Sequence, residues 1–321
     1  MFWLRFQVTT LYYLMNITER INGGNIASIY RAENESGNFV EFVESTQPPL
    51  SIKEKWLIIV SALFGCPVNC SFCKAGGKYK GPLSKKDLFF QTDFLIDQRF
   101  SNRTVTSELF ELRFARMGEP SYNINIISFL REFPARYTCN KLIPSLASIA
   151  PSANEEFFEE LLQVKKVLYP DTFRLRFSLH STDIRQRNSI LPVSKMDFAE
   201  IAGYGERFFD LKGEKVILFF PITHESLISV EVLGQYFDPE IFKIKINPVN
   251  PSIKSIMKGA EKAVMMTSQN PFLLKDLKEV GYDVELSFSE WEENEVGINC
   301  RQFANTFNET LEKTVDAKNS Y

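Results

Sequence analysis

Residues 57–77 read LIIVSALFGCPVNCSFCKAGG, and this stretch decides the fold prediction. Its first eight residues form an uninterrupted apolar run, which is typical of a strand buried on both faces of a parallel sheet. Cys66, Cys70 and Cys73 follow directly with the spacing C-x₃-C-x₂-C. The sequence therefore predicts a buried parallel strand that leads straight into a loop rich in thiols.

The same alternation of strand-like and helix-like segments continues along the chain. We expect six strands, at 57–64, 107–116, 141–149, 173–180, 215–222 and 241–247, and helices at 84–100, 123–133, 154–168, 226–237 and 269–280, with an irregular helical region after residue 180. Ser84 is the expected N-cap of the first helix. Repeated β-α units form parallel sheets with right-handed crossovers. Six units predict an α/β fold, either an open doubly wound sheet or a partial barrel.

Polar, glycine-bearing or cysteine-bearing motifs follow five of the expected strands. They are residues 65–77, 117–120, 148, 178–180 and 247–251. The carboxyl ends of parallel strands meet at one edge of a sheet, and ligands bind there in α/β folds. We therefore expect these motifs to form one site.

Composition narrows the class of protein. The chain has 321 residues, 44% of them hydrophobic, which suits one large domain. Lys and Arg number 37 against 40 Asp and Glu, a net charge of −3, so the protein does not coat nucleic acid by bulk charge. Five cysteines, three of them close together, make a poor disulfide framework and a better metal site.

The first sixteen residues, MFWLRFQVTTLYYLMN, are apolar but too short to span a membrane, which takes about 20 apolar residues. Arg5 interrupts them, and no small-residue cleavage site follows, so we expect neither a membrane anchor nor a signal peptide. Met15 is an alternative start. We expect a cytoplasmic protein.

The three clustered cysteines favour an iron–sulfur cluster. Three thiolates cannot complete a tetrahedral zinc site alone, whereas soft thiolates suit iron–sulfur centres and would leave one iron of a cubane open for a small molecule. Gly76 and Gly77 allow the backbone to approach such a group closely. A structural zinc site and reactive thiols without metal remain alternatives.

The C-x₃-C-x₂-C loop after the first of six β-α units resembles the radical S-adenosylmethionine (SAM) superfamily. Four further segments are similar, in order, to motifs of its RNA adenosine methyltransferases, the branch that includes the ribosomal antibiotic-resistance enzymes. These segments are MGEPSYN (117–123), FSLHSTDIRQRNSILPVSK (177–195), INPVNPS (246–252) and GINCRQFAN (297–305). The resemblance runs from about Glu41 to Phe307.

The resemblance implies a partial (β/α)₆ barrel at residues 57–282, preceded by a short extension at 1–56 and followed by a strand-and-helix tail at 283–321. It implies a [4Fe–4S] cluster held by Cys66, Cys70 and Cys73, with SAM chelating the fourth iron. It also implies an external one-electron reductant of the flavodoxin or ferredoxin type. The cleaved SAM would yield a radical that abstracts a hydrogen atom from the substrate.

The resemblance also assigns roles to residues outside the cysteine loop. Those that would bind SAM are Gly118 and Glu119 at its amino group, Ser178, Leu179 and His180 near its ribose and sulfonium, Asn250 at its adenosine, and Ser148, which matches the serine of the third strand. Ser148 lies in SLASIAPS, which departs from the family's STxG. Cys300 matches the cysteine that is first methylated and then carries the one-carbon unit. Glu41 matches the proton acceptor.

Three functions remain open from the sequence. The first is methylation of an unactivated carbon, as in the RNA enzymes, with Cys300 as the carrier. The second is a radical SAM enzyme of the same ancestry that acts on a substrate other than RNA, such as a small molecule or a protein, with or without methyl transfer. Ile59 favours the second, because the family has there a cysteine that resolves the covalent adduct by forming a disulfide. Residues 283–321, with nine acids and three bases, also favour it. The third is a metal-stabilised binding protein.

Overall fold

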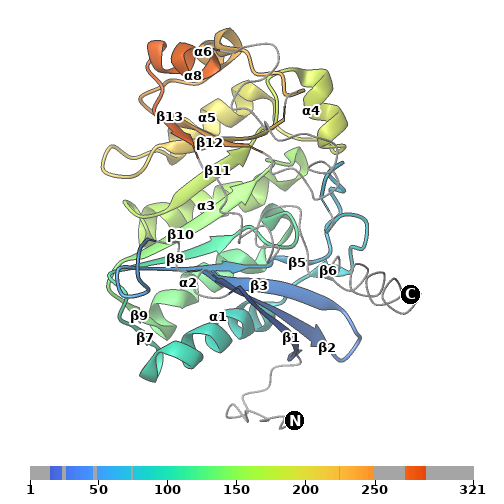
Figure 1. The fold of residues 1–321 in the computed structure, drawn as a ribbon, viewed down its shortest axis with the longest axis vertical. Helices are drawn as coiled ribbons and strands as arrows, with labels where there is room; N and C mark the ends of the chain where they lie inside the picture. Colours follow the sequence, from blue (N-terminus) through green and yellow to red (C-terminus); the bar gives the residue numbers. More distant parts are fainter. Residues whose placement is uncertain are drawn as a thin grey trace, which may run out of the picture.

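A ten-stranded sheet organises the protein (Figure 1). The computed structural model describes residues 15–23, 27–45, 49–73, 75–223, 225–248 and 272–286. The strand order is β1 (Met15–Gly23), β2 (Ala27–Asn34), β3 (Phe39–Ser45), β4 (Lys55–Val60), β8 (Leu109–Phe114), β10 (Leu142–Ser148), β11 (Arg174–Ser178), β12 (Val216–Ile222), β13 (Phe242–Pro248) and β14 (Val284–Leu286). Strands from β4 to β14 pair in parallel, while β1 to β4 pair antiparallel.

The six predicted strands are confirmed as β4, β8, β10, β11, β12 and β13, in chain order across the sheet. The helices between them are α1 (Lys85–Arg99), α2 (Asn125–Arg136), α3 (Glu155–Leu168), α4 (Ile184–Ile190), α5 (Phe198–Phe208), α6 (Val230–Tyr236) and α8 (Leu273–Glu279). Ser84 caps α1 in a capping box with Asp87, as predicted, so the start of α1 is fixed locally.

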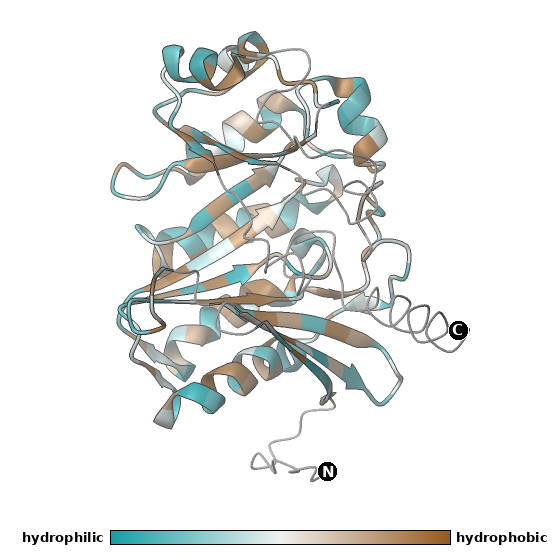
Figure 2. Ribbon diagram, in the orientation of Figure 1, coloured by the Kyte–Doolittle hydropathy of each residue, from teal (hydrophilic) through white to brown (hydrophobic). Residues whose placement is uncertain are grey.

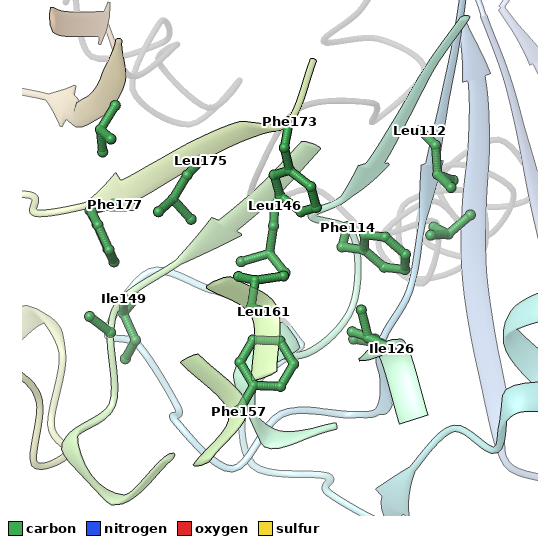
Figure 3. Packing of buried hydrophobic residues seen from close by; sticks show 14 of the residues in the cluster. Leu112, Phe114, Ile126, Leu146, Ile149, Phe157, Leu161, Phe173, Leu175 and Phe177 are labelled. Carbon is green, nitrogen blue, oxygen red and sulfur yellow. The ribbon is translucent and has the colours of Figure 1, made fainter. Parts of the chain in front are cut away.

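Helices α1, α2, α3 and α6 pack against the same face of the sheet. Neighbouring helices contact one another: α1 with α2, α2 with α3, α3 with α5, α5 with α6, and α6 with α8. Ring contacts join strand to helix on this face: Trp56 with Phe100 at the end of α1, Phe110 with Phe133, Phe177 with Phe158, and Phe242 with Phe237 next to α6. Figure 3 shows such packing, with Leu146 and Leu175 of two neighbouring strands above Leu161 of α3. One layer of helices therefore covers one side of the sheet.

Alternate residues of the strands point away from the helices. This explains why polar and apolar residues mix along the central strands in Figure 2, although the helix-facing positions are mostly apolar. In β11, Leu175 and Phe177 belong to the helix-side core, whereas Arg174, Arg176 and Ser178 face the opposite side. The opposite face is therefore the one that carries charges.

Two expected strands were too long. The run 57–64 leaves the sheet after Val60, because the side chain of Gln91 binds both backbone groups of Ser61 instead of a neighbouring strand, at 2.8 and 3.1 Å. Leu63–Phe64 forms a separate short strand, β5, with β6 (Gly81–Pro82). The run 173–180 likewise ends at Ser178. Both shortenings occur where the chain turns into a sequence motif.

The segment before residue 57, expected only as a short extension, contains regular structure. Strands β1, β2 and β3 form an antiparallel meander that continues the parallel sheet through β3 and β4. Strand β14 continues it at the other edge. The division into an extension, a core and a tail stays a prediction. Among the described residues, no helix is both long and apolar enough to cross a membrane.

Candidate functional site

The cysteine loop follows β5 and folds back on itself. The amide of Gly77 donates to the carbonyl of Cys66 at 3.1 Å, and the amide of Cys73 donates to the carbonyl of Cys70 at 3.0 Å. Gly65 has a φ of 73°, and a Cβ built on it would lie 2.2 Å from the carbonyl oxygen of Lys78. Only glycine fits there, so the closely wound loop is specified by the sequence.

The three thiols lie near one another, but they are not arranged to coordinate a single metal ion. Burial, together with negative charge on Cys73 and Cys66, raises the pKa of Cys70 to about 12. Burial also raises the pKa of Cys66, while backbone groups of Val68, Glu119 and Asn69 oppose that shift. Within the described residues, no group of three His, Cys, Asp or Glu side chains is placed to hold a metal ion.

The donor chemistry of the loop nevertheless fits an iron–sulfur cluster. Three cysteines without disulfide bonds lie on one loop, and each thiol would lose its proton on binding iron. Backbone groups already directed at the sulfur of Cys66 are the kind of second-sphere contact that such sulfurs accept. Cys66, Cys70 and Cys73 are therefore able to hold the cluster that the sequence predicts.

Glu119 is the most extensively bonded carboxylate at this edge of the sheet. Its Oε1 accepts from the hydroxyl of Ser148 at 2.5 Å and from the hydroxyl of Ser121 at 2.9 Å. Its Oε2 accepts from the amide of Ile149 at 3.0 Å. Glu119 is only 6% exposed, and burial raises its pKa although these bonds favour the ionised form. The structure thus brings Glu119 and Ser148 together, as predicted for one site.

Gly118 is fixed by its surroundings. Its φ is 87°, and a Cβ built on it would lie 2.4 Å from Cβ of Leu63, the residue that begins β5. The backbone of the neighbouring Met117 accepts hydrogen bonds from the amides of Ala62 and Leu63 at 2.8 and 3.2 Å. The motif MGEP therefore packs directly on the segment that leads into the cysteine loop.

We expect Gly118→Ala to destabilise the fold by about 1–3 kcal/mol, because the new Cβ meets Leu63 and the backbone is held in a left-handed conformation. Urea unfolding measures this change, and equilibrium dialysis with SAM shows whether binding is lost as well. Gly203→Ala is the matched control, since it lies in α5 with no atom within 4 Å of a new Cβ. Equal stability of the two variants would contradict this account of Gly118.

The segment Ser178, Leu179 and His180 reaches the cysteine loop. The amide of Leu179 donates to the carbonyl of Phe219 at 3.0 Å, which extends the pairing of β11 with β12 by one residue. His180 then turns with a φ of 68°, and its ring lies 4.8 Å from the ring of Phe72, between Ser71 and Cys73. Two motifs that are about 110 residues apart in the chain are thus in contact.

Glu41 is buried rather than open to this edge of the sheet. Its side chain is fully shielded, and its Oε2 accepts from Nη2 of Arg116 at 2.9 Å. Its carbonyl accepts from the hydroxyl of Ser61. Arg116 immediately precedes the MGEP motif, so Glu41 is coupled to the candidate site through an ion pair.

Ile59 lies in a small apolar cluster on the face opposite the helices. It packs with Ala27, Ile29, Val43 and Ile21, and it is paired with Val43 in the sheet. Glu41 lies two residues before Val43 on the same strand and so points to the same face. Position 59, where the family resemblance implies a thiol, is therefore occupied by an apolar side chain that packs among β1, β2, β3 and β4.

Two expected site residues, Asn250 and Cys300, lie outside the described part of the chain.

Sequence reasoning did not single out Ser121 and Asn123, although both lie in the motif MGEPSYN. Asn123 donates to the carbonyls of Ala62 and Leu83 at 2.7 and 2.9 Å, and so joins the two sides of the cysteine loop. The available signal for Asn123 was its position as a polar residue inside a motif that resembles the family's.

Comparison with known proteins gives relatives of one kind. No family model matches the chain. A probable dual-specificity RNA methyltransferase RlmN of Chlorobium phaeobacteroides is 25% identical over 190 residues, which cover 56% of this chain and 48% of the relative. The corresponding protein of Petrotoga mobilis is 26% identical over 246 residues, covering 73% and 65%. The chain thus spans about half to two thirds of the length of these relatives.

A solved structure agrees with these relatives. The crystal structure of a radical SAM methyltransferase from Sphaerobacter thermophilus matches with a TM-score of 0.63 and 17% identity, covering 90% of this chain and 81% of that one. At this identity the match shows a shared α/β fold with a large, mostly parallel sheet. Together the comparisons confirm the predicted resemblance to the radical SAM methyltransferases.

Proposed function

We propose, from this resemblance, that the chain is a radical SAM enzyme that methylates an unactivated carbon, with an adenine of RNA as the model substrate. One observation carries the proposal. Glu119, Ser148 and the contact of His180 with Phe72 all lie where parallel strands end beside the cysteine loop. Polar side chains that converge on thiols at this edge of an α/β sheet are placed to bind a cofactor.

The parallel strands and single helix layer support a partial (β/α)₆ barrel. The helices cover one face of the sheet in chain order. This arrangement allows the sheet to curve so that its uncovered face becomes the inside of a barrel. A doubly wound sheet would place helices on both faces. The face that carries the charged residues would then be the interior of the barrel.

Cys66, Cys70 and Cys73 would hold a [4Fe–4S] cluster, and Gly118, Glu119, Ser148, Ser178, Leu179, His180 and Asn250 would bind SAM. With an external one-electron donor, the cluster and SAM supply the radical chemistry that removes a hydrogen atom from an unactivated C–H bond. Glu119 is fixed by Ser148 and Ser121, and in its ionised form it would accept hydrogen bonds from the amino group of SAM. Gly118 has no side chain, so the backbone at this position packs closely on Leu63.

In this proposal Cys300 carries the one-carbon unit and Glu41 accepts the substrate proton. Glu41 is held in a buried ion pair with Arg116. For proton transfer to occur, the carboxylate must exchange Arg116 for the substrate.

A second candidate is a radical SAM enzyme that acts on another substrate without methyl transfer. The packing of Ile59 favours it, because a methylated cysteine would have no thiol at that position to release the product.

Mass spectrometry separates the two candidates. We expect the anaerobically reconstituted protein, incubated with SAM and reductant, to gain about 14 mass units, one CH₂ group, on the peptide that contains Cys300. Cys300→Ala should lose this gain and all methyl transfer, while iron content and SAM cleavage persist. Cys139→Ala is the matched control and should keep both. SAM cleavage without any modified Cys300 would contradict the carrier role and favour the second candidate.

A further inference from the structure

The last residue of α4 is bonded to the cysteine loop. The amide of Ser71, which follows Cys70, donates to the carbonyl of Ile190 at 3.1 Å. This bond joins the loop to the second half of the motif FSLHSTDIRQRNSILPVSK, residues 184–195. These residues have no role in the proposed function, although they lie against the thiols.

Lys195 places its ammonium group at this junction. Its Nζ donates to the side chain of Asn188 at 2.8 Å and to the carbonyls of Leu191 and Val193 at 2.9 and 3.1 Å. An ammonium group has three donors, and these three oxygens accept from all of them. Because Leu191 follows Ile190 directly, the charge is held one residue away from the carbonyl that binds the cysteine loop.

The backbone of Lys195 is fixed by the chain that follows β10. Lys195 forms a bridge with Pro151, and the amide of Met196 donates to the carbonyl of Ala150 at 2.8 Å. The end of β10 and the residue after it are also the groups that bind Glu119. The lysine therefore lies between the cysteine loop and the strand end that holds the candidate SAM site.

The charge of Lys195 interacts with the thiols. Burial and the charge of Arg187 lower the pKa of Lys195, while negative charge on Cys70 opposes that shift. The ammonium group and the sulfur of Cys70 are therefore within electrostatic reach of each other. In the described part of the chain Lys195 forms no ion pair, since the acceptors of its three hydrogen bonds are neutral.

Arg187 places a second cation behind Lys195. It is 4% exposed, its Nη1 donates to the carbonyl of Met196 at 2.9 Å, and its guanidinium lies 5.1 Å from the ring centre of Phe198. Burial lowers its pKa to about 10, although the exposed Asp197 opposes that shift. Charges that are shielded from water act over longer distances than exposed ones, because they are screened less.

We propose that Lys195, with Arg187 behind it, raises the reduction potential of the cluster on the cysteine loop. The inference rests on the proposed function, which places the cluster there. Reduction adds one electron from the external donor, breaks no bond, and makes the cluster with its thiolates more negative by one charge. A fixed cation nearby stabilises the more negative form. Glu119 interacts with the same thiols, but it does not change the sign of the contribution that Lys195 makes.

A titration of the reconstituted protein with dithionite and redox dyes, without SAM, tests this role. Electron paramagnetic resonance of the reduced cluster gives the midpoint potential. We expect Lys195→Met to lower the ratio of reduced to oxidised cluster about tenfold, as loss of a unit charge about 12 Å away does at an effective dielectric constant of about 20. For one electron this is a fall of about 59 mV. Lys195→Arg keeps the charge and should keep the potential of the unaltered protein.

Lys165→Met is the matched control. Lys165 is also 4% exposed, but it lies over the ring of Phe208 near the end of α3, the helix that leads into the start of β11. Lys195→Gln is measured beside Lys195→Met, because its amide still has donors for the loop carbonyls, and it should show the same fall. An unchanged potential in both neutral Lys195 variants, or an equal fall in Lys165→Met, would overturn the inference.

Iron content and SAM cleavage of the same samples keep the two proposals apart. A protein whose cluster potential depends on Lys195 but which cleaves no SAM would refute the proposed function alone. A protein that cleaves SAM and transfers methyl groups, with the same potential in the neutral Lys195 variants, would refute only the inference. A protein that reconstitutes no cluster would refute both.

Discussion

Cys70→Ala is expected to reduce SAM cleavage at least about 100-fold, to background, and to leave the reconstituted protein without a full complement of about four irons. The three thiols are on one loop whose backbone is fixed by glycines and internal hydrogen bonds. Removal of one sulfur leaves two of the three expected ligands on this loop, too few to hold a cluster with one open iron. Iron analysis and the yield of 5′-deoxyadenosine measure the two effects.

Cys139→Ala is the control for that experiment. Cys139 is a partly buried free thiol in β9 (Thr138–Cys139), which lies at the opposite end of the strands from the cysteine loop. It should retain normal iron content and normal cleavage. Full iron content in Cys70→Ala, or a tightly bound zinc in the unaltered protein, would contradict the cluster.

Glu119→Gln is expected to weaken SAM binding about 30-fold, which corresponds to about 2 kcal/mol for a lost charge-assisted hydrogen bond. The amide also cannot accept from Ser148, Ser121 and the amide of Ile149 at once, so the binding groups lose their arrangement. Equilibrium dialysis with SAM at several pH values measures the effect.

The pH dependence adds a second readout. Burial raises the pKa of Glu119 above its usual range, and only the ionised form accepts bonds from SAM on both oxygens. SAM affinity should therefore rise with pH through the pKa of Glu119 in the unaltered protein, and this rise should be absent in Glu119→Gln. Glu108→Gln, at an exposed position just before β8, should behave as the unaltered protein. An unchanged pH profile in Glu119→Gln would mean that another group binds the amino end of SAM.

Sequence reasoning predicted the order of strands and helices because each unit has its own signal. Continuous apolar runs marked the buried strands, and a capping residue such as Ser84 marked a helix start. The ends of strands were less predictable. The side chain of Gln91, thirty residues away, ends β4 by binding Ser61, and no local pattern indicates such a contact.

The candidate site was predicted as a set of motifs, but not as a set of contacts. Ser148 stands in a stretch that departs from the family pattern, yet its hydroxyl binds Glu119, because β8 and β10 end side by side. Glu41 was expected at the reacting centre and is instead paired with Arg116. The rows of charged residues on the face opposite the helices were equally hidden: FRLRF and FKIKI show alternation, but register alone decides which cations become neighbours.

The pairing of Glu41 with Arg116 limits how this protein can exchange parts during evolution. The carboxylate comes from β3, 75 residues before the arginine, while Arg116 leads directly into the MGEP motif. Loss of the Glu41 carboxylate would break an ion pair whose guanidinium is only 4% exposed, at a cost of about 3 kcal/mol or more. We therefore expect a recombinant that takes the meander β1–β3 from a distant relative to lose stability unless that meander also supplies a carboxylate at position 41.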